Sequence, residues 1–172
     1  APVPDLDDPE LTKTFVNPEF TGTINNFSLA GRTQEDYFNF QFTGYVNIPM
    51  DTMYSFRTTS DDGSRLLIDN VIIVDNDGKH GNKTITTDSV QLTAGLHTIQ
   101  VQYFDNTGNQ NLVVQYKGPG IGDGLTWTTI PDEALRSGEY TPPTPPSAPS
   151  NLTATASGMQ LIALSWQFGD DA

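Results

Sequence analysis

Strict alternation of apolar and polar residues is the feature that most limits how this chain can fold. From Phe38 to Ile48 every second residue is apolar, apart from Gly44 in the middle of the run. The same period of two returns over residues 97–103, where Ile99, Val101 and Tyr103 alternate with polar residues. Successive side chains of a strand point to opposite faces of a sheet, so each stretch is expected to be a strand with one buried face.

Turn signals interrupt this pattern at short intervals. Asp69 and Asn70 both tolerate a left-handed backbone and predict a two-residue hairpin connection. Residues 131–135 are long enough for only one helical turn, and no segment keeps an apolar helical stripe over more than about three turns. We therefore predict an all-β fold, a two-sheet antiparallel β-sandwich.

Composition divides the chain into three parts. Residues 1–140 contain the alternating strands and are expected to form the sandwich. Residues 141–149 are rich in proline, which predicts a semi-rigid, extended linker. Residues 150–172 hold two further strand-like segments, too few for a stable domain. We expect them to begin a second module, so that the sandwich is covalently part of a larger multidomain chain.

Charge and residue types exclude several classes of function. The net charge is −13, which argues against electrostatic binding of nucleic acid or anionic lipid. It fits a protein that binds divalent cations, and equally one whose acidity only keeps it soluble. The absence of cysteine excludes disulfides, thiolate zinc sites and thiol catalysis. No apolar run is long enough to cross a bilayer, and membrane insertion is not expected.

An acidic turn lies between an aromatic strand and an apolar one. Asp61 and Asp62 are adjacent, so on a regular strand their side chains would point to opposite faces. They act together only if the chain turns sharply there, and Gly63, which tolerates positive φ, makes such a turn plausible. Two like charges this close repel, and a cation would relieve the repulsion. Hard oxygen ligands favour Ca²⁺, so the turn is a candidate half of a calcium site.

Three pieces of sequence resemble one known family. They are FTGYV at residues 42–46, YSFRTTSDDGSRL at residues 54–66, and GLH at residues 95–97 leading to YFDN at residues 103–106. Together they resemble the anthrax protective-antigen domain family, PA-fourteen, over about residues 15–139. A shorter stretch, from Pro146 to Trp166, resembles the opening of a fibronectin type III module.

The resemblance implies a twisted β-sandwich of the kind found in bacterial adhesins, glycosidases, toxins and yeast flocculins. In the sugar-binding members a cis peptide bond joins the two aspartates. A Ca²⁺ ion then bridges that pair, a second loop and vicinal hydroxyls of a glycan. The implied function is a calcium-dependent carbohydrate-binding module, a lectin rather than an enzyme. It would belong to an extracellular or cell-surface bacterial adhesin and would bind cell-surface glycans or polysaccharide.

The resemblance also implies a set of site residues. In the family the second loop supplies amide and backbone carbonyl oxygens at alternating positions. On this sequence the calcium ligands then fall on Asp61, Asp62, Asn106, Gly108 and Gln110. A frame shifted by one residue gives Asp105, Thr107 and Asn109 instead. The expected sugar contacts are Asp61, Asp62, Asn109, Gln110 and Asn111.

Other interpretations remain open at this point. The acidic turn and the 105–111 segment can be a plain turn and a solvated loop, in a structural spacer that binds no sugar. Residues 75–78 can be a turn or a second, structural calcium site. The module can also be an accessory glycan-binding domain of a glycoside hydrolase. Asp61 and Asp62 are themselves too close together to serve as a hydrolytic carboxyl pair. His80 is expected to brace its loop, and His97 and Trp127 are expected in the core.

Overall fold

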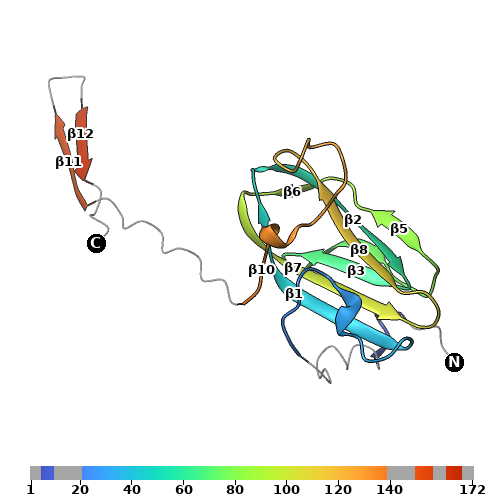
Figure 1. Cartoon of the computed structure of the whole chain (residues 1–172). Coiled ribbons are helices and arrows are strands. Elements are labelled where there is room, and N and C mark those ends of the chain that lie inside the picture. Colours follow the sequence, from blue (N-terminus) through green and yellow to red (C-terminus); the bar gives the residue numbers. More distant parts are fainter. Residues whose placement is uncertain (1–4, 10–20, 139–149, 157–161, 168–172) are drawn as a thin grey trace. The chain divides into compact units, whose positions relative to one another are not determined.

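The computed structural model describes residues 5–9, 21–138, 150–156 and 162–167. The chain separates into two compact units, Ala1–Gly138 and Glu139–Ala172. The first unit is built mainly of strands (Figure 1), and its described residues include two short 3₁₀ helices, η1 (Leu29–Gly31) and η2 (Asp132–Ala134). The second of these confirms the single helical turn expected over residues 131–135. In the part of the chain described, no helix is long and apolar enough to span a bilayer.

One antiparallel sheet of the first unit has the strand order β10–β1–β7–β3–β4. Its strands are β1 (Phe38–Ile48), β3 (Ser64–Ile68), β4 (Val71–Asn76), β7 (Gly95–Asp105) and β10 (Leu135–Arg136). β1 and β7 pair along their whole length, from Phe38 opposite Asp105 to Ile48 opposite Gly95. These are the two stretches that alternate most strictly, so the strands predicted from the period of two are confirmed.

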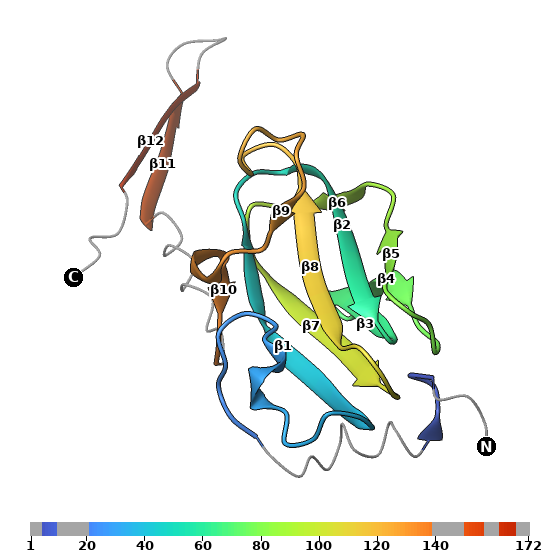
Figure 2. The ribbon, with the colours of Figure 1, turned by 45° about the vertical axis from the view of Figure 1, so that its right-hand side comes forward.

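The second antiparallel sheet has the order β5–β2–β8–β9. Its strands are β2 (Thr52–Asp61), β5 (Lys83–Thr86), β8 (Asn111–Lys117) and β9 (Thr128–Thr129). A short strand, β6 (Val90–Leu92), pairs with the beginning of β2. Figure 2 shows β5, β2 and β8 running side by side. The predicted all-β fold with two antiparallel sheets is therefore confirmed.

The core contains the apolar residues that alternate along the strands of both sheets. Its largest fully buried side chains include Tyr54, Phe56, Tyr103 and Phe104. Trp127 is not in this core; it is half-buried beside β8, so the expectation of a core tryptophan is wrong. The sequence could not show this, because the strand that follows Trp127, β9, has only two residues and no readable period.

The β3–β4 hairpin turns at Asp69 and Asn70, whose φ angles are 49° and 63°. Two successive left-handed residues are the signature of the tight hairpin turn that matches strand twist, as predicted. His97 lies beside this turn, with its Nδ1 2.6 Å from Asp69 Oδ2 and its Nε2 2.9 Å from the carbonyl of Thr93. It is hydrogen-bonded, but it stands outside the apolar cluster in which it was expected.

In the second unit, β11 (Ser150–Ala156) and β12 (Ile162–Gln167) form a two-stranded antiparallel sheet. They coincide with the two strand-like segments expected there. The proline-rich linker predicted for residues 141–149 lies outside the described residues. The fibronectin type III assignment and the predicted limits of the domains stay predictions.

Gly63 has a role that differs from the one expected. It is not among the glycines with positive φ, so the acidic turn does not need its left-handed freedom. Instead the ring of Phe104 lies directly against its Cα, and an added Cβ would clash with the Cε1, Cζ and Cδ1 atoms of that ring. The amide of Phe104 also donates to the carbonyl of Gly63, at 3.0 Å. Gly63 is therefore required for close packing between the turn and β7.

Replacing this glycine should destabilise the fold. We expect Gly63→Ala to lower the free energy of unfolding by about 1–3 kcal/mol, the usual cost of overpacking a tight site. Urea denaturation would measure the change. Gly81→Ala is the matched control, because nothing lies within 4 Å of a Cβ at that position and its φ is not positive. Equal stability of the two variants would contradict the packing role of Gly63.

Candidate functional site

Three connections between the two sheets lie at one end of the sandwich. Residues 61–63 join β2 to β3, residues 77–82 join β4 to β5, and residues 106–110 join β7 to β8. The pairings Asp61 with Asn111, Ser64 with Tyr103, and Ser60 with Lys83 place all three at the same end. Residues 35–37 reach this end as well, because Phe38 pairs with Asp105. The fold thus gathers four polar segments around the acidic turn.

The peptide bond between Asp61 and Asp62 is cis, as the family resemblance implied. Asp62 is buried, with 2% of its surface exposed. Its Oδ1 accepts the backbone N–H of His80 at 2.9 Å, and its Oδ2 accepts that of Asn106 at 2.8 Å. One carboxylate therefore ties the 77–82 and 106–110 connections to the acidic turn through hydrogen bonds to a charged acceptor.

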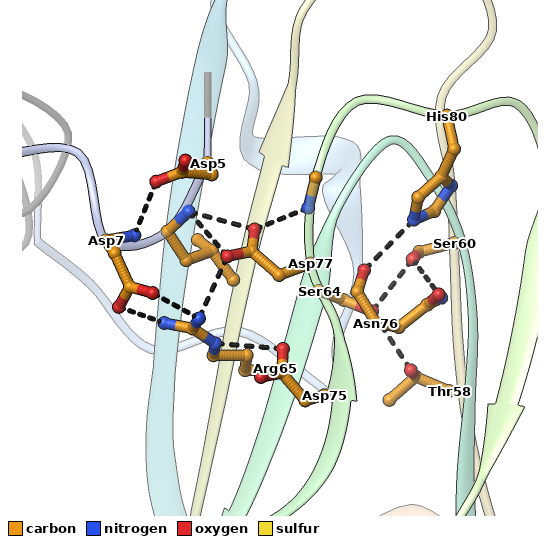
Figure 3. A network of polar contacts seen from close by, with 12 residues as sticks. Asp5, Asp7, Thr58, Ser60, Ser64, Arg65, Asp75, Asn76, Asp77 and His80 are labelled. Atoms are coloured by element: carbon orange, nitrogen blue, oxygen red, sulfur yellow. Dashed lines mark hydrogen bonds and ion pairs between the residues drawn. The ribbon is translucent and has the colours of Figure 1, made fainter. Parts of the chain in front are cut away.

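Ser60 and Ser64, on either side of the acidic turn in the sequence, belong to a buried cluster of hydroxyl and amide side chains (Figure 3). Ser64 Oγ lies 2.8 Å from Ser60 Oγ and donates to Thr58 Oγ1 at 3.0 Å. The side-chain amide of Asn76 donates to Ser60 Oγ at 2.9 Å and to the carbonyl of Lys83 at 3.0 Å. The His80 ring contacts the carbonyls of Asn76 and Gly81, which confirms its expected role in bracing the loop.

Asp105 has a buried carboxylate whose charge is not balanced by hydrogen bonds from the described part of the chain. It is 3% exposed, and among the described residues neither carboxylate oxygen has a hydrogen-bond partner of ordinary geometry. Burial raises the pKa of Asp105 to about 6, with further increases from the negative charges of Asp62, Asp36 and Asp61. A nearby contact with the backbone amide of Tyr37 lowers the pKa only in part. An orphaned, buried carboxylate among other carboxylates is a site that favours a cation.

Asp36 belongs to the same cluster and was not identified from the sequence. Its Oδ1 accepts the backbone N–H of Gly108 at 2.9 Å. The neighbouring carbonyl of Glu35 accepts Gln110 Nε2 at 2.7 Å, so the segment before β1 is fastened to the 106–110 loop twice. No local motif marks Asp36, because only the long pairing of β1 with β7 places it beside Asp105.

The remaining predicted residues lie around this cluster with different environments. Asp61 is half-buried; its carbonyl accepts the Tyr103 hydroxyl, and its carboxylate has no hydrogen-bond partner among the described residues. Gly108 presents its carbonyl to Gln110 Nε2 at 2.6 Å. Asn111 Nδ2 donates to Asn82 Oδ1 at 2.6 Å, and Asn109 is exposed. The loop expected to face the aspartates does face them, through Asn106.

Comparison with known proteins decides the family. The sequence profile of the PA14 domain matches residues 9–125, more than half of the chain. This chain belongs to the PA14 domain family. PA14 is the protective-antigen domain family that the sequence motifs resemble, so that part of the sequence analysis is confirmed. No curated protein is similar enough to match the chain.

Solved structures share the PA14 fold with this chain. The PA14 domain of the antifreeze protein MpAFP is 24% identical, with a TM-score of 0.53 over 62% of this chain and 55% of that one. An anti-sigma factor domain-containing protein from Clostridium clariflavum is 26% identical, with a TM-score of 0.51 over 74% of this chain and 42% of that one. The chain thus spans about half of the length of these structures.

A third solved structure is described as a PA14 sugar-binding domain from an RTX adhesin. It is 23% identical, covers 57% of this chain and 53% of that one, and has a TM-score of 0.49. A likeness at this level is too distant to carry an argument about ligands. The chemistry of the site in this PA14 domain must therefore be argued from its own residues.

The donor set of the acidic end fits a hard cation. Asp61 and Asp105 supply carboxylates without hydrogen-bond partners, Asp62 adds a third, and Asn106 supplies an amide oxygen that accepts no hydrogen bond from the described residues. Their acidic oxygens are spread more widely than those of Asp5, Asp7 and Asp77, the one acidic trio among the described residues whose ligand atoms all lie within 4.8 Å of one another. Oxygens bound to one Ca²⁺ lie at most about 5 Å from one another, so Asp61, Asp62 and Asp105 can bind the same ion only after their side chains move closer together.

The tighter acidic trio already has a cation. Arg65 lies between these residues, with Nη1 2.7 Å from Asp7 Oδ1 and Nη2 2.9 Å from Asp77 Oδ2 (Figure 3). Its Nε is 3.0 Å from Asp75 Oδ1. Hydrogen bonding to the guanidinium lowers the pKa of Asp7. Asp75 and Asp77, from the segment where a second calcium site was one alternative, are thus neutralised by a side chain of the protein itself.

The raised pKa of Asp105 makes the stability of the metal-free domain depend on pH. The carboxyl ordinarily has a pKa of 3.8, and the fold raises it to about 6. The native state then keeps a proton that the unfolded state loses, so stability falls as the pH rises from about 4 to about 6. Above about pH 6 the ionised Asp105 lowers the free energy of unfolding by an amount on the order of 3 kcal/mol.

Asp105→Asn removes this titration. In a chelating buffer at pH 7 we expect the variant to be more stable than the parent chain, by up to about 3 kcal/mol. At pH 4 most of the difference should disappear, because the native-state carboxyl of Asp105 is then protonated. Urea denaturation at the two pH values measures it, and the other carboxyls cancel in the comparison. A difference that does not change with pH would show that Asp105 is not strained by its charge.

Proposed function

We propose that this PA14 domain is a calcium-dependent carbohydrate-binding module. The observation that carries the proposal is the buried Asp105 carboxylate, which has no hydrogen-bond partner of ordinary geometry among the described residues and is surrounded by the charges of Asp36, Asp61 and Asp62. Burying a carboxylate in this state is costly unless a cation accompanies it. Unlike Asp7, Asp75 and Asp77, this cluster forms no ion pair with an arginine of the described part of the chain.

The residues proposed to hold the ion come from the turn and the facing loop. Asp61, Asp62 and Asp105 would provide carboxylate oxygens once their side chains have moved within reach of one ion, and Asn106 would provide an amide oxygen. Gly108 and Gln110 complete the set implied by the family, once Gln110 Nε2 releases the carbonyl of Gly108 that it now contacts. When bound, Ca²⁺ supplies open coordination positions that two adjacent sugar hydroxyls can fill in place of water.

The chain's own residues would orient the sugar. Asp61 is placed to accept hydrogen bonds from hydroxyls, because its carboxylate makes no hydrogen bond to the described residues. Asn109 is exposed at the tip of the second loop, and Asn111 lies next to Asp61 across the β2–β8 pairing. Gln110 and Asp62 remain proposed sugar contacts, although both already hold other segments in place. Such a small set of polar contacts implies weak binding at one site, which repetition on a surface would strengthen by avidity.

The proposed setting is a multidomain bacterial adhesin at the cell surface, acting on cell-surface glycans or polysaccharide. No catalytic activity is proposed. A retaining or inverting hydrolase needs two carboxyls roughly 5–10 Å apart across the scissile bond, whereas Asp61 and Asp62 are adjacent and Asp62 is fastened to two backbone amides. A spacer that binds nothing would explain the fold. It would not explain why Asp105 is buried without a hydrogen-bond partner of ordinary geometry among the described residues.

Calcium should stabilise the native domain. An ion present at about 100 times its dissociation constant adds about 2.7 kcal/mol to the free energy of unfolding. That corresponds to a rise in Tm of roughly 5–10 °C. Thermal unfolding followed by circular dichroism, with excess calcium and then with excess chelator, tests this; magnesium at the same concentration controls for charge screening. An identical Tm in all three buffers would contradict a metal site.

Asp61→Asn should abolish calcium-dependent sugar binding while preserving the fold. It removes a carboxylate that has no hydrogen-bond partner among the described residues, and is therefore a cleaner test than a change at the structural Asp62. A glycan array read with calcium and again with chelator gives the measurement. Asp88→Asn, an exposed carboxylate on the connection between β5 and β6, is the control for loss of one charge. Sugar binding that survives both chelator and Asp61→Asn would refute the proposed mechanism.

A further inference from the structure

A second surface with a different chemistry lies on the outer face of the β5–β2–β8–β9 sheet. Trp127 is half-buried there, and two cationic groups lie near its ring. The guanidinium carbon of Arg57 is 4.5 Å from the centre of its ring, and the ammonium nitrogen of Lys117 is 4.8 Å from it. Two cations thus lie close to one indole ring, where attraction to the ring quadrupole stabilises them.

The strand register shows that this surface is the outward one. Tyr54, Phe56, Thr58 and Ser60 are the buried residues of β2, so Ser55, Arg57 and Thr59 face away from the core. Ser55 is paired with Lys117 and Arg57 with Gln115, so these residues of β8 share the outer face. Figure 2 shows β9, β8, β2 and β5 in this sheet.

The cations on this face are held in place but not neutralised. Arg57 Nε donates to Gln115 Oε1 at 2.7 Å, and Gln115 in turn contacts Thr129 at 3.5 Å. Neither Arg57 nor Lys117 has a carboxylate partner among the described residues. Arg65 and Arg32, in contrast, form ion pairs with aspartate or glutamate. Two unpaired cations on one indole are notable in a chain with eight lysines and arginines and a net charge of −13.

We propose that Trp127, Arg57 and Lys117 form a second sugar subsite, specific for saccharides that carry carboxylate or sulfate groups. The two cations would receive the anionic group, and the guanidinium offers paired donors suited to a planar carboxylate or a sulfate. The indole would contact the apolar face of the adjoining ring. The inference extends the proposed function, since it names an acidic polysaccharide as the ligand class, but the subsite itself needs no metal.

The subsite lies on the same side of the sheet as the acidic turn. Asp61 and Arg57 are both outward residues of β2 and are four positions apart, which corresponds to about 13 Å along the strand. Thr59 lies between them, with its Oγ1 2.7 Å from Thr84 Oγ1 of β5. A polysaccharide chain that follows β2 would therefore meet both the proposed calcium site and the cation pair.

Binding in chelator tests the subsite separately from the calcium site. The probe is a chondroitin sulfate hexasaccharide, titrated against the full chain in excess chelator, with a neutral dextran oligosaccharide of similar length as comparison. The fluorescence of Trp127 reports binding in a Trp166→Phe background, since the chain has two tryptophans. We expect binding of the sulfated probe only, with affinity that decreases as salt is added.

Variants then assign the binding to the proposed residues. Arg57→Gln and Lys117→Gln should each weaken binding of the hexasaccharide by about tenfold, and together by more. Lys117→Gln is informative even if Arg57→Gln perturbs the fold, because the Lys117 side chain makes no hydrogen bond to the described residues. Lys83→Gln is the matched control: Lys83 is exposed and pairs with the inward-facing Ser60, so its charge lies away from this surface.

Three outcomes would overturn the proposal. One is no binding of the sulfated probe in chelator, and another is equal loss of affinity in Lys83→Gln. The third is competition by a single-stranded oligonucleotide of the same charge with the same affinity, which would indicate general attraction of polyanions. None of these depends on calcium, so failure here leaves the proposed calcium-dependent binding untouched, and failure of that binding leaves this result standing.

Discussion

The buried carboxylate of Asp62 is the interaction on which the acidic end of this domain depends. It receives the backbone amides of His80 and Asn106, which belong to the two other connections between the sheets. A charged acceptor makes both hydrogen bonds stronger than neutral ones. The Asp62 carboxylate is, however, buried beside Asp105 and Asp61, where water screens its negative charge poorly. The same residue that organises the loops therefore creates the need for a positive charge.

The two aspartate clusters of the domain differ in how their negative charge is balanced. Around Arg65, three aspartates from the N-terminal segment and from β4 and its following loop are neutralised internally, and the result is an anchor for the residues before the sandwich. At the acidic turn, no cationic side chain of the described residues forms an ion pair with the cluster, and Asp105 has no hydrogen-bond partner of ordinary geometry there. This contrast supports the proposal that the cluster at the acidic turn binds a metal cation.

The sequence predicted the parts of this structure that local patterns encode. Alternation identified β1 and β7, and two left-handed residues identified the hairpin at Asp69 and Asn70. Prediction from the sequence failed for residues whose role depends on tertiary packing. Gly63 was interpreted through backbone freedom, although the ring of Phe104 is the reason for it. Asp36 carries no signal of its own, because only a register of eleven paired residues brings it to Asp105. Trp127 was expected in the core, but it is half-buried beside β8.

The two proposed surfaces have opposite electrostatic character, and this bears on specificity. A chain with a net charge of −13 repels polyanions over most of its surface, so an acidic polysaccharide gains nothing from general attraction. On our proposal it would bind where positive charge is concentrated, at Arg57 and Lys117 and, with calcium bound, at the acidic turn. Because both places lie along the outer face of β2, the spacing of charges on the ligand would matter more than their number. Repulsion elsewhere then acts as a selection against ligands with the wrong spacing.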